Sequence, residues 1–220
     1  MQHGQNDYST SIPMLQALSS SKSVPMVRVP WSEPGIIMKM LDLGVMGIIA
    51  PMINTKDDCE KFVSYCYYPP IGQRSFGPMR AQLVHGSDYF TNANKNILSF
   101  AMIETKEAVE NLDQILSVPS LTGVYIGPAD MSSSYGLPPK FDVREDPVFS
   151  NIKLIAKKAK EYGKIAGIHN GSTAYAKEMI NLGYKFVTIL SDFRVMSSNS
   201  QKIVDEMKDT KNDGKEASTY

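Results

Sequence analysis

Two carboxylates that lie one repeat unit apart have the clearest potential for chemistry. Glu104 ends the apolar run 99–103, and Asp130 follows the run 125–129. If both runs are neighbouring parallel strands, the two side chains meet at one edge of the sheet and can hold the same ion. Oxygen ligands with positions left for water or substrate suit Mg²⁺ or Mn²⁺ better than Zn²⁺. The alternative is that each acid only caps the helix that follows it.

The basic residues give weaker signals. Arg28 ends the apolar stretch 25–29, where a guanidinium is costly unless it faces a carboxylate or an anionic ligand. Arg28 therefore predicts either an internal ion pair or an anion site. Arg74 follows a stretch rich in Pro and Gly, which fits a solvated surface position equally well. His3 lies in a polar opening stretch and supports no role by itself.

Strands and helices alternate along the chain. Short apolar runs rich in β-branched residues predict buried strands, and segments with helical spacing lie between them. The expected strands are 25–29, 45–52, 98–104, 121–127, 164–168 and 185–190, and the expected helices are 35–43, 56–67, 106–118, 147–162 and 173–182. This alternation predicts a parallel sheet covered by helices, as an open doubly wound sheet or as a closed barrel.

The distribution of polar residues favours the barrel. They fall at or just past the carboxyl ends of several expected strands, namely Arg28, Glu104, Asp130, His169 with Asn170, and Asp192. Contributions from many strands are typical of a TIM-type (β/α)8 barrel, whereas an open sheet concentrates its site at one switch point and usually carries a glycine-rich phosphate turn. The chain has no such turn. Lys164 and Lys185 begin their strands at the opposite edge, which argues against imine chemistry.

Composition narrows the classes of partner. Among 220 residues, 42% are hydrophobic, and 23 basic residues balance 23 acidic ones. A net charge of zero gives no general attraction for nucleic acid or an anionic membrane surface. No run approaches the roughly 18 apolar residues of a membrane span, and the first residues do not resemble a secretion signal. We therefore expect a cytoplasmic protein with a small-molecule ligand.

A family resemblance runs from His3 to about Asp192. An ordered set of motifs resembles the HpcH/HpaI aldolase family: Gln2-His3-Gly4, Val27-Arg28-Val29-Pro30-Trp31, Leu41-Asp42-Leu43-Gly44, Tyr68-Pro69-Pro70 with Gly72 and Arg74, Ile103-Glu104-Thr105, and Gly127-Pro128-Ala129-Asp130. The resemblance implies a (β/α)8 barrel, commonly a hexamer with exchanged C-terminal helices. It also implies a divalent cation, Mg²⁺, Mn²⁺ or Co²⁺, and a 2-keto acid substrate.

The resemblance implies a role for each matching residue. Glu104 and Asp130 would hold the metal, and Arg28 would contact the carboxylate and enolate oxygens of the keto acid. His3 would be the general base, and Asp42 would orient or polarise it. The substrate would also be bound by the backbone of the motif Gly127, Pro128, Ala129 and Asp130.

The chain also departs from the family pattern. The family histidine motif reads D-x-x-H-G, but Met1 takes its second position here and the leading aspartate is absent. Six strands are predicted where a closed barrel has eight, which indicates a barrel domain over 1–207 that is truncated at its N-terminus. An internal start of the gene model, completion of the barrel by association, and a decayed remnant all fit. Residues 208–220 are predicted to form a polar tail.

The resulting functional prediction is a metal-dependent aldolase. It would cleave a 4-hydroxy-2-oxo acid into pyruvate and an aldehyde through a metal-stabilised pyruvate enolate. We expect the segment 79–96 and neighbouring subunits to shape the aldehyde pocket. Two alternatives remain: an acyl-CoA lyase or oxaloacetate decarboxylase of the same superfamily, and a non-catalytic subunit that binds metal and keto acid.

Overall fold

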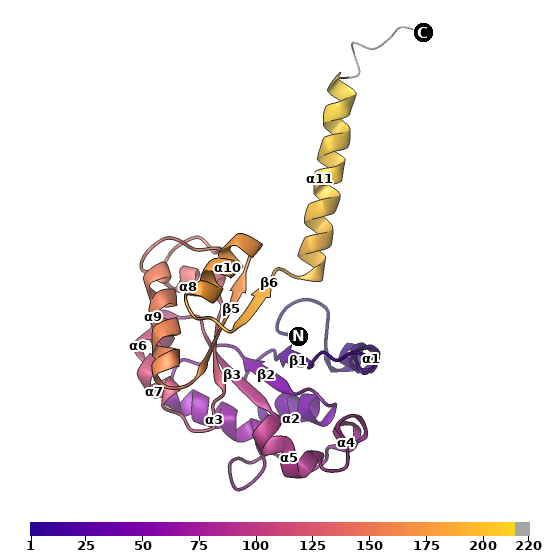
Figure 1. The fold of residues 1–220 in the computed structure, drawn as a ribbon, viewed down its shortest axis with the longest axis vertical. Helices are drawn as coiled ribbons and strands as arrows, with labels where there is room; N and C mark the ends of the chain where they lie inside the picture. The colour runs from indigo at the N-terminus through magenta and orange to yellow at the C-terminus, as the bar shows by residue number, and fades with distance from the viewer. Residues whose placement is uncertain (214–220) are drawn as a thin grey trace.

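A parallel sheet of six strands organises the chain (Figure 1). The computed structural model describes residues 1–213, with side chains up to residue 208. The strands lie side by side in chain order, and every neighbouring pair is parallel. They are β1 (Met26–Arg28), β2 (Gly47–Ala50), β3 (Leu98–Ile103), β4 (Gly123–Ile126), β5 (Ile165–Asn170) and β6 (Phe186–Ile189). The sheet curls into a half-barrel, which confirms the predicted α/β barrel architecture.

Helices cover the outer face of this sheet. The expected helices 35–43, 56–67, 147–162 and 173–182 appear as α2 (Pro34–Asp42), α3 (Lys56–Cys66), α9 (Val148–Glu161) and α10 (Thr173–Asn181). The expected helix 106–118 is instead two short helices, α6 (Lys106–Glu110) and α7 (Leu112–Leu116). The break falls at Asn111, whose Nδ2 donates a hydrogen bond to the Asn54 carbonyl at 3.0 Å.

Several helices were not predicted. They are α1 (Tyr8–Leu18), α4 (Met79–His85), α5 (Tyr89–Asn96) and α8 (Pro128–Ser134). Helices α4 and α5 fill the segment 79–96 and lead into the start of β3, so this segment lies near the amino edge of the sheet. Within one chain it therefore does not line the carboxyl edge, and its expected part in an aldehyde pocket shared with neighbouring subunits stays a prediction.

Helix starts show how local sequence sets these elements. The Thr55 side chain accepts a hydrogen bond from the Asp58 amide, and the Asp58 carboxylate accepts one from the Thr55 amide. This reciprocal pair satisfies amides that the first turn of α3 leaves without partners, an effect worth about 1 kcal/mol. The cap fixes α3 directly after the loop that follows β2.

Apolar side chains pack on both faces of the sheet. A large cluster fills the space between the strands and the outer helices and includes Ile103, Phe62 and Ile152. A smaller cluster on the inner face consists of Ile49, Phe100, Met102 and Tyr125, with Met26, Leu98, Ile165 and Phe186 against it. Because successive strand residues point to opposite faces, Phe100 and Met102 face inward while Ala101 and Ile103 face outward.

The last helix, α11 (Asp192–Asp213), projects from the body of the molecule (Figure 1). It carries exposed apolar side chains, among them Phe193, Met196 and Ile203. It also runs into the stretch expected to be a polar tail, so residues 208–213 are helical, and 214–220 lie outside the described residues. No helix in the described part of the chain is long and apolar enough to cross a membrane.

Candidate active site

Glu104 is the most unusual side chain of the carboxyl edge. It follows β3 directly and is 1% exposed. Its Oε1 accepts a hydrogen bond from the Met52 amide at 2.8 Å, but its buried Oε2 has no hydrogen-bond partner. The pKa of this carboxyl is raised to about 7, mainly by burial and also by the charge of Asp130. The Met52 hydrogen bond and the charge of Arg28 oppose part of this rise. A buried, half-satisfied carboxylate is costly to maintain, which favours a functional role.

Gly127 makes room for this carboxylate. A Cβ at Gly127 would lie 2.6 Å from Glu104 Oε2 and 3.1 Å from Met102 Cε. A side chain at this position would force the Glu104 carboxylate to move, because real Cβ atoms do not approach other heavy atoms so closely. The glycine of the Gly-Pro-Ala-Asp motif is therefore explained by close approach to Glu104.

Asp130 completes the predicted pair of carboxylates. It lies in the first turn of α8, directly after β4, and is exposed. Its charge raises the pKa of Glu104, so the two acids lie near each other at this edge of the sheet, and their joint role as metal ligands stays a prediction.

The two acids fit a hard divalent cation. Glu104 offers an orphaned oxygen, and Asp130 offers an exposed carboxylate beside it. In the described residues no group of three or more His, Cys, Asp or Glu side chains could hold a metal. Mg²⁺ and Mn²⁺ accept such a sparse set of protein ligands, because water and substrate fill their remaining positions.

Arg28 lies at the end of β1 and faces the same inner region. Its strand register places it level with Ile49 and Phe100, both of which face inward. Its charge lowers the pKa of Glu104 and, besides burial, that of His169. No carboxylate forms an ion pair with Arg28 in the described part of the chain. The internal ion pair considered from the sequence is therefore absent, and a free guanidinium faces the site.

His3 is not brought into a polar network by this chain. It is exposed, and within the described residues its side chain makes no hydrogen bond or ion pair. The nearby amino group of Met1 has a lowered pKa, first from burial and second from the charge of Arg28. The N-terminal segment thus lies near the guanidinium, and a role of His3 as general base remains a prediction.

Asp42 lies elsewhere. It is the last residue of α2, which runs from the carboxyl edge back to the amino edge of the sheet. Its Oδ1 accepts a hydrogen bond from Arg74 Nη2 at 2.7 Å. Arg74 is 1% exposed, stacks its guanidinium 4.4 Å from the Tyr68 ring centroid, and also donates to the Tyr89 hydroxyl. The structure does not bring Asp42 to His3, and it buries Arg74, which the sequence left open as a surface residue.

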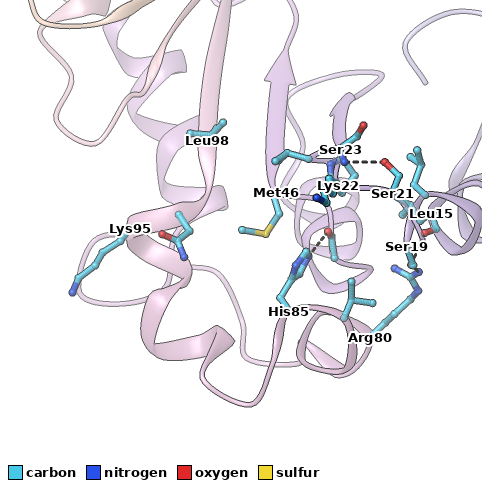
Figure 2. A pocket seen from close by; sticks show the side chains of 16 residues that line it. Leu15, Ser19, Ser21, Lys22, Ser23, Met46, Arg80, His85, Lys95 and Leu98 are labelled. Atoms are coloured by element: carbon cyan, nitrogen blue, oxygen red, sulfur yellow. Dashed lines mark hydrogen bonds between the residues drawn. The ribbon is translucent and has the colours of Figure 1, made fainter.

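A cavity lies at the amino edge. It measures about 620 Å³, lies beside α1, α4 and the starts of β1, β2 and β3, and its lining side chains are drawn in Figure 2. The lining includes Lys22, Arg80, His85 and Lys95 but no acid. The Arg80 guanidinium donates hydrogen bonds to the Leu43 carbonyl and to the Ser19 hydroxyl. His85 Nε2 lies 2.7 Å from the carbonyl oxygen of Gly44. This cavity contains none of the predicted site residues.

Comparison with known proteins identifies the family. The family model for HpcH/HpaI aldolase/citrate lyase matches residues 1–197. The chain belongs to this family. It is similar to a hydroxypyruvate/pyruvate aldolase of Rhizorhabdus wittichii, with 40% identity over 93% of this chain and 81% of the relative. It is also similar to a 5-keto-4-deoxy-D-glucarate aldolase of Escherichia coli, with 35% identity over 94% of this chain and 81% of the relative.

Solved structures agree on the fold. A HpcH/HpaI aldolase/citrate lyase family protein from Burkholderia cenocepacia superposes with a TM-score of 0.84 at 27% identity, over 92% of this chain and 81% of that one. A HpcH/HpaI aldolase from Desulfitobacterium hafniense gives a TM-score of 0.86 at 21% identity, over 94% of this chain and 81% of that one. The resemblance predicted from the motifs is confirmed, and the relatives named above are aldolases.

The structure adds residues that sequence reasoning did not assign to this HpcH/HpaI site. The Met52 amide contacts Glu104, and Tyr125 and Thr188 form a hydrogen bond on the inner face at 2.5 Å between their oxygens. The backbone amide carries no sequence signal. Alternation along β4 and β6 could have indicated Tyr125 and Thr188, because polar groups at inward positions of a barrel strand are unusual.

Proposed function

We propose that this chain is a divalent-metal-dependent aldolase that cleaves a 4-hydroxy-2-oxo acid into pyruvate and an aldehyde. The observation that carries the proposal is the buried Glu104 carboxylate with its unpartnered Oε2, next to Asp130 and Arg28. Membership in a family whose named relatives are pyruvate-type aldolases supports it. The substrate itself is proposed only as a class.

Each charged residue has a distinct part in this proposal. Glu104 and Asp130 would hold the cation, and Arg28 would bind the carboxylate of the keto acid. When bound, the cation supplies Lewis acidity at the 2-keto oxygen. Cleavage places negative charge on the three-carbon product, and the fixed charge of Arg28 would stabilise it.

A base must also remove the proton of the 4-hydroxyl group. His3 is our candidate, because the N-terminal segment lies near Arg28 and an imidazole can act as a general base. The side chain must then turn from solvent toward the substrate.

The test is a coupled assay for pyruvate. The purified chain is incubated with Mn²⁺ or Mg²⁺ and 4-hydroxy-2-oxobutanoate, and pyruvate is followed with and without a chelator. Release that stops with the chelator and returns with added metal supports the proposal. An Arg28→Met variant should raise KM for the keto acid by about 100-fold, since it removes a charge-assisted hydrogen bond. Release that is insensitive to the chelator, or none from folded protein, contradicts the proposal.

A further inference from the structure

His169 occupies the same inner layer as Glu104. The registers pair Ile103 with Ile126, Ile126 with Ile168, and Ile168 with Val187. The next row of laterally paired positions, one residue further along each strand, consists of Glu104, Gly127, His169 and Thr188. Alternation places this row on the inner face, two residues beyond the inward-facing Met102 and Tyr125.

In that row Gly127 lies between Glu104 and His169, and the Glu104 carboxylate takes the space over it. Strands two positions apart are separated by about 10 Å, and the residue between these two has no side chain. Glu104 Oε2 leans over Gly127, as its 2.6 Å distance from a Cβ built there shows. Glu104 Oε2 thus points toward the strand that carries His169, and an oxo acid held there would reach toward the imidazole.

A short hydrogen-bond chain orients the His169 imidazole. Its Nδ1 lies 2.9 Å from Thr188 Oγ1, and Thr188 Oγ1 lies 2.5 Å from the Tyr125 hydroxyl. When Tyr125 donates to Thr188 and Thr188 donates to Nδ1, the ring proton of neutral His169 is on Nε2. Burial lowers the pKa of His169, and the charges of Arg28 and Arg194 lower it further, while the charge of Asp142 opposes them. The neutral form of His169 therefore predominates near pH 7.

Packing holds the ring in place. The Phe141 ring meets the His169 ring edge-on, with centroids 4.8 Å apart. The loop that carries Phe141 is tied to the end of β5, because the Gly171 amide donates to Asp142 Oδ1 at 2.7 Å. His169 is half-buried, and its Nε2 forms no hydrogen bond with the described residues.

We propose that His169 is a specificity-determining contact that donates its Nε2–H to an oxygen of the aldehyde half of the substrate. This inference rests on the proposed aldolase function. In the proposed function, the carboxylate of the keto acid is bound by Arg28, and its 2-keto oxygen by the cation that Glu104 and Asp130 would hold. The substrate oxygens beyond C3 are left for His169. The chain therefore selects short aldehydes that carry a hydroxyl group next to the aldehyde carbon. Thr188 and Tyr125 act as positioning residues.

The test compares two aldehydes of nearly equal size in the reverse reaction. Pyruvate and Mg²⁺ are combined with glycolaldehyde or with propanal, which lacks the hydroxyl group, and kcat/KM is measured for each. His169→Leu should lower the ratio of glycolaldehyde to propanal about 10- to 100-fold, because a polar site discriminates by the hydrogen bond it makes. His169→Gln keeps an N–H donor and should retain part of the ratio. Thr188→Val should lower it less than His169→Leu.

Controls separate this inference from the proposed function. His85→Gln, which changes a histidine of the amino edge, should leave the ratio unchanged. If the enzyme is active and the ratio of kcat/KM for glycolaldehyde to that for propanal is the same in wild type and His169→Leu, the proposed role of His169 is wrong but the proposed function stands. A folded wild type that makes no product with either aldehyde contradicts the proposed function instead.

A binding measurement decides the inference even without turnover. The chain has only three histidines, so imidazole ¹⁵N resonances are assigned with single variants. We expect His169 to carry its proton on Nε2 and to shift when glycolaldehyde is added with pyruvate and Mg²⁺, but not with propanal. Equal responses to the two aldehydes, or no response to either, overturn the inference.

Discussion

The two edges of the sheet use charged residues in opposite ways. Four charged or titratable residues of the amino edge have polar partners, namely Arg74, Asp42, Arg80 and His85, and the cavity of about 620 Å³ lies beside the last two. At the carboxyl edge, Glu104 Oε2 has no partner and Arg28 forms no ion pair among the described residues. The cavity therefore lies at the edge where Arg80 and His85 have polar partners, whereas the unpartnered carboxylate oxygen of Glu104 lies at the other edge.

This difference has an energetic reason. A buried charge without a partner destabilises the fold by several kcal/mol, so it persists only where a ligand supplies the missing interaction. The Arg74 guanidinium has the opposite charge of Asp42 and the Tyr89 hydroxyl as partners from its own chain, and only its Nε has none. Glu104 has no positively charged partner in an ion pair among the described residues, so a bound cation would stabilise it.

The largest effect should come from Glu104→Gln. The amide keeps the shape and an acceptor for the Met52 N–H but loses the charge, so chelator-sensitive pyruvate release should fall at least about 1,000-fold. Thermal unfolding without metal should change little or shift upward, because the cost of burying a charge is removed. Glu110→Gln, on the exposed face of α6, is the matched control. Activity of Glu104→Gln equal to that of the control would place the chemistry elsewhere.

A second test closes the space over Gly127. In Gly127→Ala the new methyl group would lie 2.6 Å from Glu104 Oε2, so the carboxylate must move. We expect about a 100-fold loss of turnover, as for a misplacement of about 1 Å, and a destabilisation of about 1–3 kcal/mol from overpacking. Kinetics and urea unfolding measure the two effects. Gly35→Ala, whose added Cβ meets nothing within 4 Å, should keep full activity. Turnover of Gly127→Ala within a factor of two of wild type would contradict this picture.

The pH dependence of metal binding should report on Glu104. Its pKa is about 7 without metal, and a cation binds the deprotonated form, so apparent Mn²⁺ affinity should rise about 10-fold from pH 6 to pH 8. The folded-state pKa is above its ordinary value of 4.5, so the contribution of Glu104 to stability without metal should fall as pH rises from about 4.5 to 7. Calorimetric titration at several pH values measures the affinity. A flat profile, matching that of Glu104→Gln, would exclude Glu104 as the titrating ligand.

The sequence was sufficient to predict the framework but not every helix. Strands of a parallel sheet are buried on both faces, and their apolar runs are visible without knowledge of neighbours. Helix α1 was missed because its apolar residues are interrupted by Ser9, Thr10 and Pro13, and its Asp7 cap forms a signal only together with Thr10. The break at Asn111 depends on a contact with Asn54, which is distant in sequence.

The site was predictable to the extent that it lies at strand ends. Glu104 and Asp130 are one strand apart, and parallel topology alone brings them to one edge. Asp42 shows the limit of this reasoning, because its position at the end of α2 directs it to the other edge. His169 was visible as a polar residue near a strand end, but its bond to Thr188 requires the register of β5 and β6.

The smallest effect should come from Asp42→Asn, which sharpens the contrast between the edges. Arg74 would keep the Tyr89 hydroxyl and the Tyr68 ring but lose its charged partner, and since the Asp42 side chain is 29% exposed we expect a loss of only about 1–2 kcal/mol. Urea unfolding measures the loss, and kcat should stay within a factor of two. Glu178→Gln, which breaks a surface pair with Arg144, controls for loss of any acid. A fall in kcat of more than 10-fold at unchanged stability would mean that Asp42 takes part in the reaction, as the family resemblance implies. Because Asp42 lies at the opposite edge from Glu104 within one chain, that result would require a second copy to supply it.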